Sequence, residues 1–321
     1  MIEDKIRQVA SLIDPLLKDS LYGSDNLHKA ALYLPSQGGK RMRAFLVVKS
    51  CELAGGNVKL ALPAAAAIEV LHNFTLIHDD IMDHDLLRRG VPTVHKLWGV
   101  PMGILAGDLL FAKAFNILLS AEVEPERLRR AAQIMSESAV SLSEGQSMDM
   151  EFESRLDVSE DEYLLMVTKK TASLFEASAK IGATIGGGTP NLISLLGEYG
   201  RNLGVGFQIF DDYLGLTSKE EVLGKSVGND IREGKMTLIV IRSLNSPLRE
   251  RILSLLGKKY ASDEELTKLV DALRREGIDN YVLKKANFHI DLAIRALSSI
   301  PDSPTKQDLV ELARYAISRI K

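Results

Sequence analysis

Residues 76–83 read Leu76-Ile77-His78-Asp79-Asp80-Ile81-Met82-Asp83, an apolar run that leads into three aspartates. At 3.6 residues per turn, Asp79 and Asp83 fall on one face of a helix with Asp80 beside them. Their like charges repel, and aspartate is a mediocre helix former, so a purely structural reason for this patch is hard to find. A cation would remove the repulsion, and carboxylate oxygens suit Mg²⁺. The alternative is a solvated acidic helix face.

The sequence on either side of this stretch predicts an all-α protein. Apolar residues recur at helical spacing in most windows, and strand-like alternation is nearly absent. Capping boxes at Ser159–Glu162 and Ser262–Glu265 start two helices, and Ser303 followed by Pro304 starts another. No Gly/Ser-rich or charge-block linker divides the chain, so we expect a single domain over residues 1–321, built as a helical bundle.

Composition narrows the classes of function. Lys plus Arg is 40 and Asp plus Glu is 43, and this net charge of −3 argues against nucleic-acid binding. The single cysteine, Cys51, cannot close a bridge within the chain. The apolar stretches 60–71 and 102–121 are interrupted by charged residues, and the N-terminus has no signal-peptide pattern. We therefore expect a cytoplasmic protein without a membrane span.

A second acidic motif follows at Asp211-Asp212-Tyr213-Leu214-Gly215. On its C-terminal side, residues 224–235 carry glycines and lysines suited to a loop that contacts phosphate. A hinge between two helices is the alternative reading. Basic residues also cluster at 38–43, 88–90 and 169–171, and each cluster alone could be a solvated surface pair. Together with the two acidic motifs, they indicate a site for two diphosphates.

This combination of motifs resembles the trans-isoprenyl diphosphate synthases, or polyprenyl synthetases, and among them the archaeal-type short-chain geranylgeranyl diphosphate synthases. The resemblance covers nearly the whole chain and implies an all-α bundle around a central cavity, the isoprenoid synthase fold, in a homodimer. The matching pieces are Gly38-Gly39-Lys40-Arg41-Met42-Arg43, Leu71-His72, residues 76–83, Leu87-Arg88-Arg89-Gly90, Gly145-Gln146, Lys170-Thr171, Phe207-Gln208-Ile209-Phe210-Asp211-Asp212 and Gly224-Lys225.

The resemblance also implies the roles of individual residues. The catalytic set is Asp79, Asp80, Asp83, Asp211, Asp212, Lys170 and Lys225. Three Mg²⁺ ions per active site would take Asp79, Asp83 and Asp211 as principal ligands, with Asp80 and Asp212 supporting them. The allylic diphosphate would be held by Arg88, Lys170, Gln208 and Lys225, with Thr171 and Lys235 also on the substrate side. Isopentenyl diphosphate would be held by Lys40, Arg43, His72 and Arg89.

The sequence departs from the commoner family pattern at two positions. Gly215 stands where many members have a third aspartate, and Ala44 where many have proline. Two acids remain in the second motif, and some archaeal-type short-chain synthases share the form with glycine. We therefore expect Gly215 to reduce the number of carboxylates available for metal binding without abolishing activity.

The implied reaction is the head-to-tail condensation of isopentenyl diphosphate with an allylic diphosphate. Chain length would be set before the first acidic motif by Phe74, Thr75 and Leu71, because one helical turn of about 5.4 Å is close to one isoprene unit. This pattern favours the C20 product, geranylgeranyl diphosphate, and leaves farnesyl (C15) or longer products open. Phe74 could also be ordinary core. A terpenoid cyclase and a non-catalytic subunit of a heteromeric synthase are the competing functions.

Overall fold

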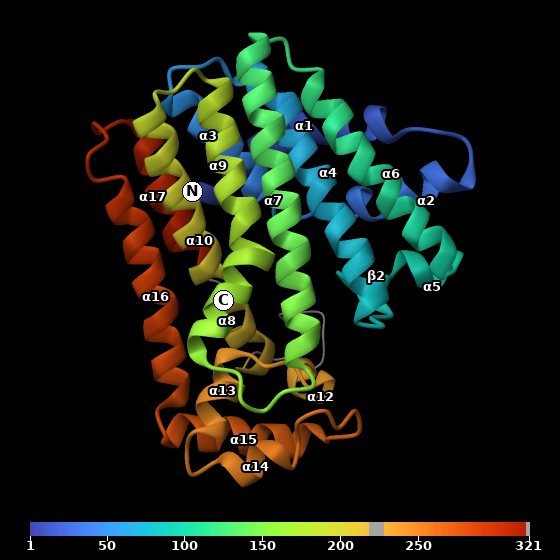
Figure 1. Cartoon of the computed structure of the whole chain (residues 1–321), viewed down its shortest axis with the longest axis vertical. Helices are drawn as coiled ribbons and strands as arrows, with labels where there is room; N and C mark the ends of the chain where they lie inside the picture. The colour runs from blue at the N-terminus through green and yellow to red at the C-terminus, as the bar shows by residue number, and fades with distance from the viewer. Residues whose placement is uncertain (218–227, 319–321) are drawn as a thin grey trace. The chain divides into compact units, whose positions relative to one another are not determined.

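The computed structural model describes residues 1–217 and 228–318, and these fold almost entirely into helices (Figure 1). Gly224 and Lys225 lie outside the described residues. The all-α prediction is confirmed. The contacts of the chain group into two compact units: one is Met1–Ser138, Leu174–Glu198 and Leu297–Leu312, and the other is Ala139–Ser173, Tyr199–Ala296 and the chain from Ala313 on. The single domain and its central cavity stay predictions.

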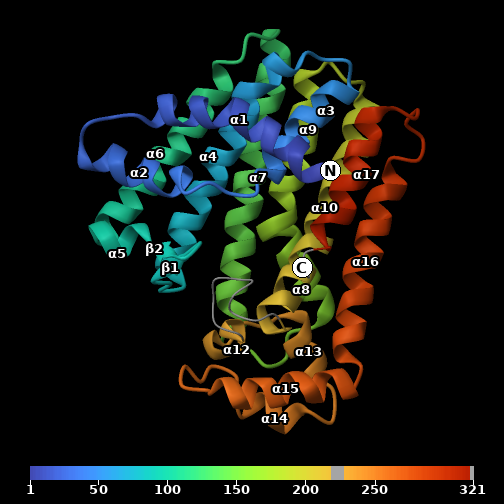
Figure 2. The ribbon, with the colours of Figure 1, turned by 180° about the vertical axis from the view of Figure 1, so that it is seen from behind.

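The first unit is built on α4, which carries the first acidic motif at its end. Four consecutive alanines, residues 64–67, are fully buried and let α3 and α6 pack closely against α4. A hairpin of β1 and β2 follows α4 (Figure 2). The elements that lie within this unit are α1 (Ile2–Leu21), α2 (Asn26–Ser36), α3 (Met42–Leu53), α4 (Val58–Met82), β1 (Leu87–Arg88), β2 (Val91–Pro92), α5 (Val94–Trp98) and α6 (Val100–Leu119).

The second unit surrounds its own hydrophobic core, to which α8, α10, α13, α15 and α16 contribute fully buried side chains. Both predicted capping boxes are confirmed: Ser159 starts α8 and Ser262 starts α15. The elements that lie within this unit are α8 (Glu160–Val167), the π-helix η1 (Thr168–Ala172), α12 (Asn229–Glu233), α13 (Leu238–Leu244), α14 (Arg249–Leu253), α15 (Asp263–Arg275) and α16 (Ile278–Ala296).

Four helices run through both units of the chain. They are α7 (Pro125–Phe152), α9 (Ser173–Ile185), α10 (Pro190–Thr217) and α17 (Pro304–Ala316). The last of these begins at Pro304, as the sequence predicts.

Two helices, α4 and α6, are long and apolar enough to cross a membrane by length and composition. Most of the apolar window of α4 is buried inside the protein, and the helix also carries the buried Glu69. Burial of this kind is typical of a core helix in a water-soluble fold. The apolar window of α6 is less buried than that of α4.

Candidate active site

The first acidic motif lies at the C-terminal end of α4. Asp83 caps the helix, and its backbone N–H donates to the carbonyl of Asp79 at 2.8 Å. The prediction that the two aspartates lie one turn apart is confirmed, although Asp83 lies just beyond the last helical residue, Met82. A helix C-terminus carries partial negative charge, so three carboxylates there destabilise the free protein. This arrangement favours the binding of cations.

The β1–β2 hairpin turns Arg88 back toward these carboxylates. Its two loop residues, Arg89 and Gly90, have positive φ angles of 55° and 77°, the requirement of a tight type I′ turn. Arg88 Nε donates to Asp80 Oδ1 at 2.5 Å, and Arg88 Nη2 lies 3.9 Å from Asp79 and 3.8 Å from Asp85. Arg88 therefore offsets part of the negative charge of the patch, and its contact with a diphosphate stays a prediction.

Asp80 is the most deeply buried member of the patch, with 1% of its surface exposed. Burial raises the pKa of Asp80 to about 6, although the positive charge of Arg88 opposes the shift. Among the described residues, Asp80 Oδ2 has no hydrogen-bond partner. This oxygen therefore keeps unused acceptor capacity, which a metal ion or its bound water would satisfy.

The carboxylates at the end of α4 fit Mg²⁺ as part of its ligand set rather than as the complete set. Over residues 1–217 and 228–318, no three His, Cys, Asp or Glu side chains converge closely enough to hold a metal ion alone. Mg²⁺ usually keeps several waters and takes one or two carboxylates together with substrate phosphates. The acidic end of α4 therefore suits a Mg²⁺ that arrives with its diphosphate. Asp79 and Asp83 belong to the first unit and Asp211 to the second, and their joint action stays a prediction.

A basic corner of the first unit holds part of the set predicted for isopentenyl diphosphate. Arg43 Nη1 donates to His72 Nε2 at 3.2 Å, and the Arg43 guanidinium lies 4.2 Å above the ring of Phe175. Burial and the charges of Arg43 and Arg89 hold the pKa of His72 well below its usual value. His72 is therefore neutral, and its proton sits on Nδ1, because a guanidinium can only donate.

The loop before α3 completes this corner. Arg89 donates through Nη1 to the carbonyl of Gly38, which fixes the hairpin against the loop, and a Cβ at Gly39 would lie 3.2 Å from the Arg89 guanidinium. Lys40 follows on the exposed part of the loop. The structure therefore brings Arg43, His72 and Arg89 close to the Lys40 segment, as the resemblance implies.

The second acidic motif lies on α10, and its Asp212 belongs to a chain of hydrogen bonds. Asp212 accepts from the Tyr163 hydroxyl at 2.6 Å and from Gln208 Nε2 at 2.7 Å, so both of its oxygens are engaged. Gln208 Oε1 accepts in turn from Thr171 Oγ1 at 2.8 Å. Burial and the nearby charge of Asp230 raise the pKa of Asp212 to about 8. The supporting role of Asp212 in metal binding stays a prediction.

Lys170 and Thr171 lie on the π-helix η1, a form of helix that often marks functional sites. Lys170 Nζ donates to Asp149 Oδ2 of α7 at 2.5 Å. A Cβ at Gly145 of α7 would lie only 2.2 Å from the backbone nitrogen of Lys170. Glycine at this position is therefore needed for α7 to pack directly against the π-helix. The sequence pattern predicts neither this contact nor the π-helix.

Asp230 is an acid that the sequence pattern misses. A Cβ at Gly215 would lie 2.9 Å from Asp230 Oδ2, and the N–H of Gly228 donates to the carbonyl of Gly215 at 2.9 Å. A carboxylate from the start of α12 therefore lies beside the position where many relatives have a third aspartate. Lys235, just after α12, pairs with Glu233 at 3.4 Å.

The residues predicted to set chain length lie along α4. Phe74 packs edge-to-face on Phe111 of α6 with ring centroids 5.2 Å apart, and Phe111 packs in the same way on Phe115 at 5.4 Å. Thr75 donates to the carbonyl of His72 within α4, and Leu71 is completely buried. Phe111 and Phe115 are additional candidates that the pattern before Asp79 cannot reveal.

Comparison with known proteins identifies the family. The polyprenyl synthetase family matches residues 24–273. The geranylgeranyl diphosphate synthase of Methanosarcina mazei is 44% identical over 318 residues, covering 98% of this chain and 97% of the relative.

Solved structures agree with this match. The geranylgeranyl pyrophosphate synthetase of Pyrococcus horikoshii superposes with a TM-score of 0.93 at 42% identity, covering 99% of this chain and 98% of that one. The geranylgeranyl pyrophosphate synthase of Corynebacterium glutamicum, complexed with isoprenyl diphosphate and magnesium, superposes with a TM-score of 0.84 at 28% identity, covering 99% and 97%. The chain belongs to the polyprenyl synthetase family.

Proposed function

We propose that this protein is a trans-prenyltransferase that condenses isopentenyl diphosphate with allylic diphosphates and releases geranylgeranyl diphosphate. The observation that carries the proposal is the acidic end of α4 faced by Arg88, since one corner then offers carboxylates for a cation and a guanidinium for a diphosphate. Nearly full-length similarity to the Methanosarcina mazei synthase supports the same activity.

Mg²⁺ is the proposed cofactor, three ions per active site, with Asp79, Asp83 and Asp211 as the principal residues that would hold it. Bound Mg²⁺ would neutralise the negative charge of the departing diphosphate. The buried, unpartnered oxygen of Asp80 and the presence of magnesium in the Corynebacterium glutamicum structure support this assignment.

The protein's own groups would bind and orient the two substrates. Arg88, Lys170, Gln208 and the loop residue Lys225 would hold the allylic diphosphate, and Lys40, Arg43 and Arg89 would hold the isopentenyl diphosphate. The neutral His72 would contact the same diphosphate, while its Nε2 accepts a hydrogen bond that orients Arg43. Fixed cationic donors of this kind need no reorganisation as charge develops on the leaving group.

Bond changes in the condensation need no protein nucleophile. The C–O bond of the allylic diphosphate breaks, and the diphosphate leaves with the electron pair. The double bond of isopentenyl diphosphate then attacks the allylic cation and forms the new C–C bond. Loss of one proton to the released diphosphate restores a double bond. The enzyme's contribution is therefore positioning and charge stabilisation.

Product length would depend on the aromatic row Phe74, Phe111 and Phe115. The Phe74 ring, five residues before Asp79, would stop a growing chain, and Phe111 supports that ring from α6. A stop at this depth favours the C20 product over C15 or longer chains.

We also propose that the protein acts as a cytoplasmic homodimer. The face of α6 leaves several large apolar side chains exposed, namely Ile104, Leu105, Phe111 and Leu119, each between 38% and 54%. A second copy of the chain would bury this face. The one cysteine is buried, and burial raises the pKa of its thiol to about 11, so this thiol is unreactive.

Diphosphate release tests the proposed activity. The purified protein is incubated with isopentenyl diphosphate and an allylic diphosphate of C5, C10 or C15, with and without Mg²⁺. We expect release only when both substrates and Mg²⁺ are present. Release from the allylic diphosphate alone would indicate a cyclase, and no release from any pair would indicate a non-catalytic subunit.

A further inference from the structure

Arg41 stands inside the basic segment predicted to bind isopentenyl diphosphate, between Lys40 and Arg43, yet it is directed into the protein. Only 3% of its surface is exposed. Its backbone has φ 48° and ψ 24°, in the left-handed region that residues with a side chain rarely adopt. A conformation of this kind persists only when the surrounding structure holds it.

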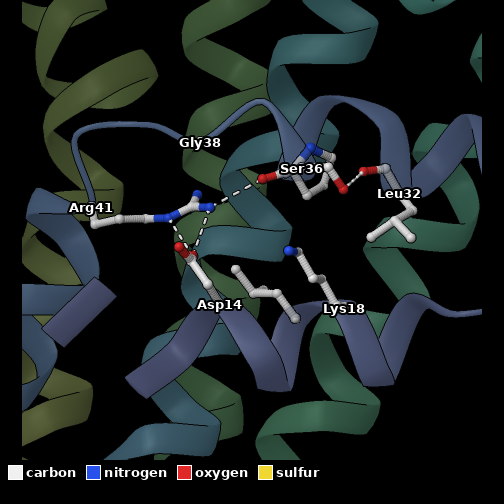
Figure 3. Close-up of a pocket in the computed structure, with 8 residues that line it drawn as sticks. Asp14, Lys18, Leu32, Ser36, Gly38 and Arg41 are labelled. Atoms are coloured by element: carbon white, nitrogen blue, oxygen red, sulfur yellow. Dashed lines mark hydrogen bonds and ion pairs between the residues drawn. The ribbon is translucent and has the colours of Figure 1, made fainter. Parts of the chain in front are cut away.

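Three helices hold the Arg41 guanidinium. Nε donates to Asp14 of α1 at 3.1 Å, Nη1 donates to Glu69 of α4 at 3.2 Å, and Nη2 donates to the carbonyl of Pro35 in α2 at 3.1 Å. Figure 3 shows Arg41 and Asp14 joined at the edge of a pocket of about 60 Å³, with Lys18 beside it. Each of the three nitrogens donates to a protein oxygen, and the side chain is almost completely buried, so the guanidinium serves contacts inside the protein.

Glu69 links the guanidinium to the first turn of α3. Its Oε2 accepts from Arg41, and its Oε1 accepts from the backbone N–H of Ala44 at 3.2 Å. Glu69 itself is only 3% exposed. The first N–H groups of a helix have no partner within the helix, so this carboxylate both caps α3 and fixes the residue that precedes it.

We infer that Arg41 and Glu69 are positioning residues for the isopentenyl diphosphate site, an inference that rests on the proposed function. Their contacts hold the backbone around Arg41 in its left-handed conformation and fix the first turn of α3 through Ala44. Lys40 and Arg43 then project from a fixed start of α3 toward the diphosphate. Without the network, Arg41 relaxes to an ordinary backbone conformation and the two flanking cations move apart.

Steady-state kinetics of Arg41→Gln and Glu69→Gln test the inference. We expect the KM for isopentenyl diphosphate to rise about 10- to 100-fold in both, because a misplaced cation loses a charge-assisted hydrogen bond, which contributes a factor of this size to binding. The KM for the allylic diphosphate stays within about twofold of the wild-type value, since its predicted ligands lie elsewhere. A general loss of folding would instead lower the active fraction and leave both KM values unchanged.

Asp308→Asn is the matched control. Asp308 is 7% exposed and pairs with Lys5 at 2.6 Å and with Lys49 of α3 at 3.1 Å, so its change also removes a buried carboxylate that contacts α3. We expect a lower melting temperature and an unchanged KM for isopentenyl diphosphate.

Each outcome decides between distinct conclusions. An unchanged KM for isopentenyl diphosphate in Glu69→Gln, or an equal rise in both KM values, overturns the positioning role. If neither buried variant folds, Asp14→Asn provides the test, because Asp14 forms the half-exposed end of the network. An unchanged KM for isopentenyl diphosphate in Asp14→Asn then overturns the positioning role. A wild-type protein that condenses no pair of substrates refutes the proposed function instead.

Discussion

Gly145→Ala is the substitution whose effect follows most directly from the backbone of the second unit. The added Cβ would lie 2.2 Å from the nitrogen of Lys170 and 2.7 Å from its Cα. Both neighbours are main-chain atoms, so no flexible side chain can move aside. The two backbones must separate by at least about 1.2 Å before the contact becomes an ordinary van der Waals distance.

This displacement moves Lys170 and its neighbour Thr171. Thr171 begins the hydrogen-bonded chain that runs through Gln208 to Asp212 of α10. Overpacking of this kind costs about 1–3 kcal/mol of folding free energy. A shift near 1 Å in a substrate-binding group lowers the rate by up to about 100-fold. We therefore expect kcat/KM for the allylic diphosphate to fall by up to about 100-fold, while the KM for isopentenyl diphosphate changes little.

Steady-state kinetics with each substrate varied in turn measure the effect, and thermal unfolding measures stability. Gly186→Ala is the matched control, because its Cβ would lie 2.5 Å from the carbonyl oxygen of Cys51 in the first unit. It should lower stability and leave kcat/KM unchanged at temperatures where it is folded. A Gly145→Ala enzyme with wild-type kcat/KM would refute the argument that this contact positions Lys170.

Three further substitutions test separate parts of the site. Phe74→Ala should lengthen the products sized by mass spectrometry, because it removes the ring predicted to stop the chain; an unchanged distribution would exclude Phe74. Gly215→Asp should not raise kcat/KM, because its Cβ would lie 2.9 Å from Asp230 Oδ2 and its carboxylate would add a like charge beside Asp230; activity that appears only in this variant would contradict that view. Tyr163→Phe should lower the free energy of unfolding in urea by about 1–3 kcal/mol, because it removes a donor from the buried Asp212; no change would show that this bond is dispensable.

Local features of the sequence predicted the fold well. Helical periodicity gave the all-α class, and the hydroxyl-to-glutamate spacing at Ser159 and Ser262 placed two helix starts correctly. The spacing of the acidic run also predicted that Asp79 and Asp83 lie one turn apart, although Asp83 is the cap rather than part of the helix. These features depend on neighbours within one or two turns, so the sequence alone contains them.

Contacts between distant segments could not be predicted in this way. Tyr163 reaches Asp212 across 49 residues, and Asp230 approaches Gly215 through the start of a separate helix. Phe111 meets Phe74 only because α6 packs on α4. The inward direction of Arg41 depends on three helices at once, so its charge alone would place it wrongly on the surface.

Mass spectrometry of the reaction products tests the central claim most directly. The purified protein is given Mg²⁺, isopentenyl diphosphate and the C15 allylic diphosphate, and the products are sized. We predict a single extension to the C20 diphosphate, with none formed when Mg²⁺ is chelated. Absence of any extended product with Mg²⁺ present would contradict the claim that this chain is a prenyl-chain synthase, and products longer than C20 would contradict only the proposed role of Phe74.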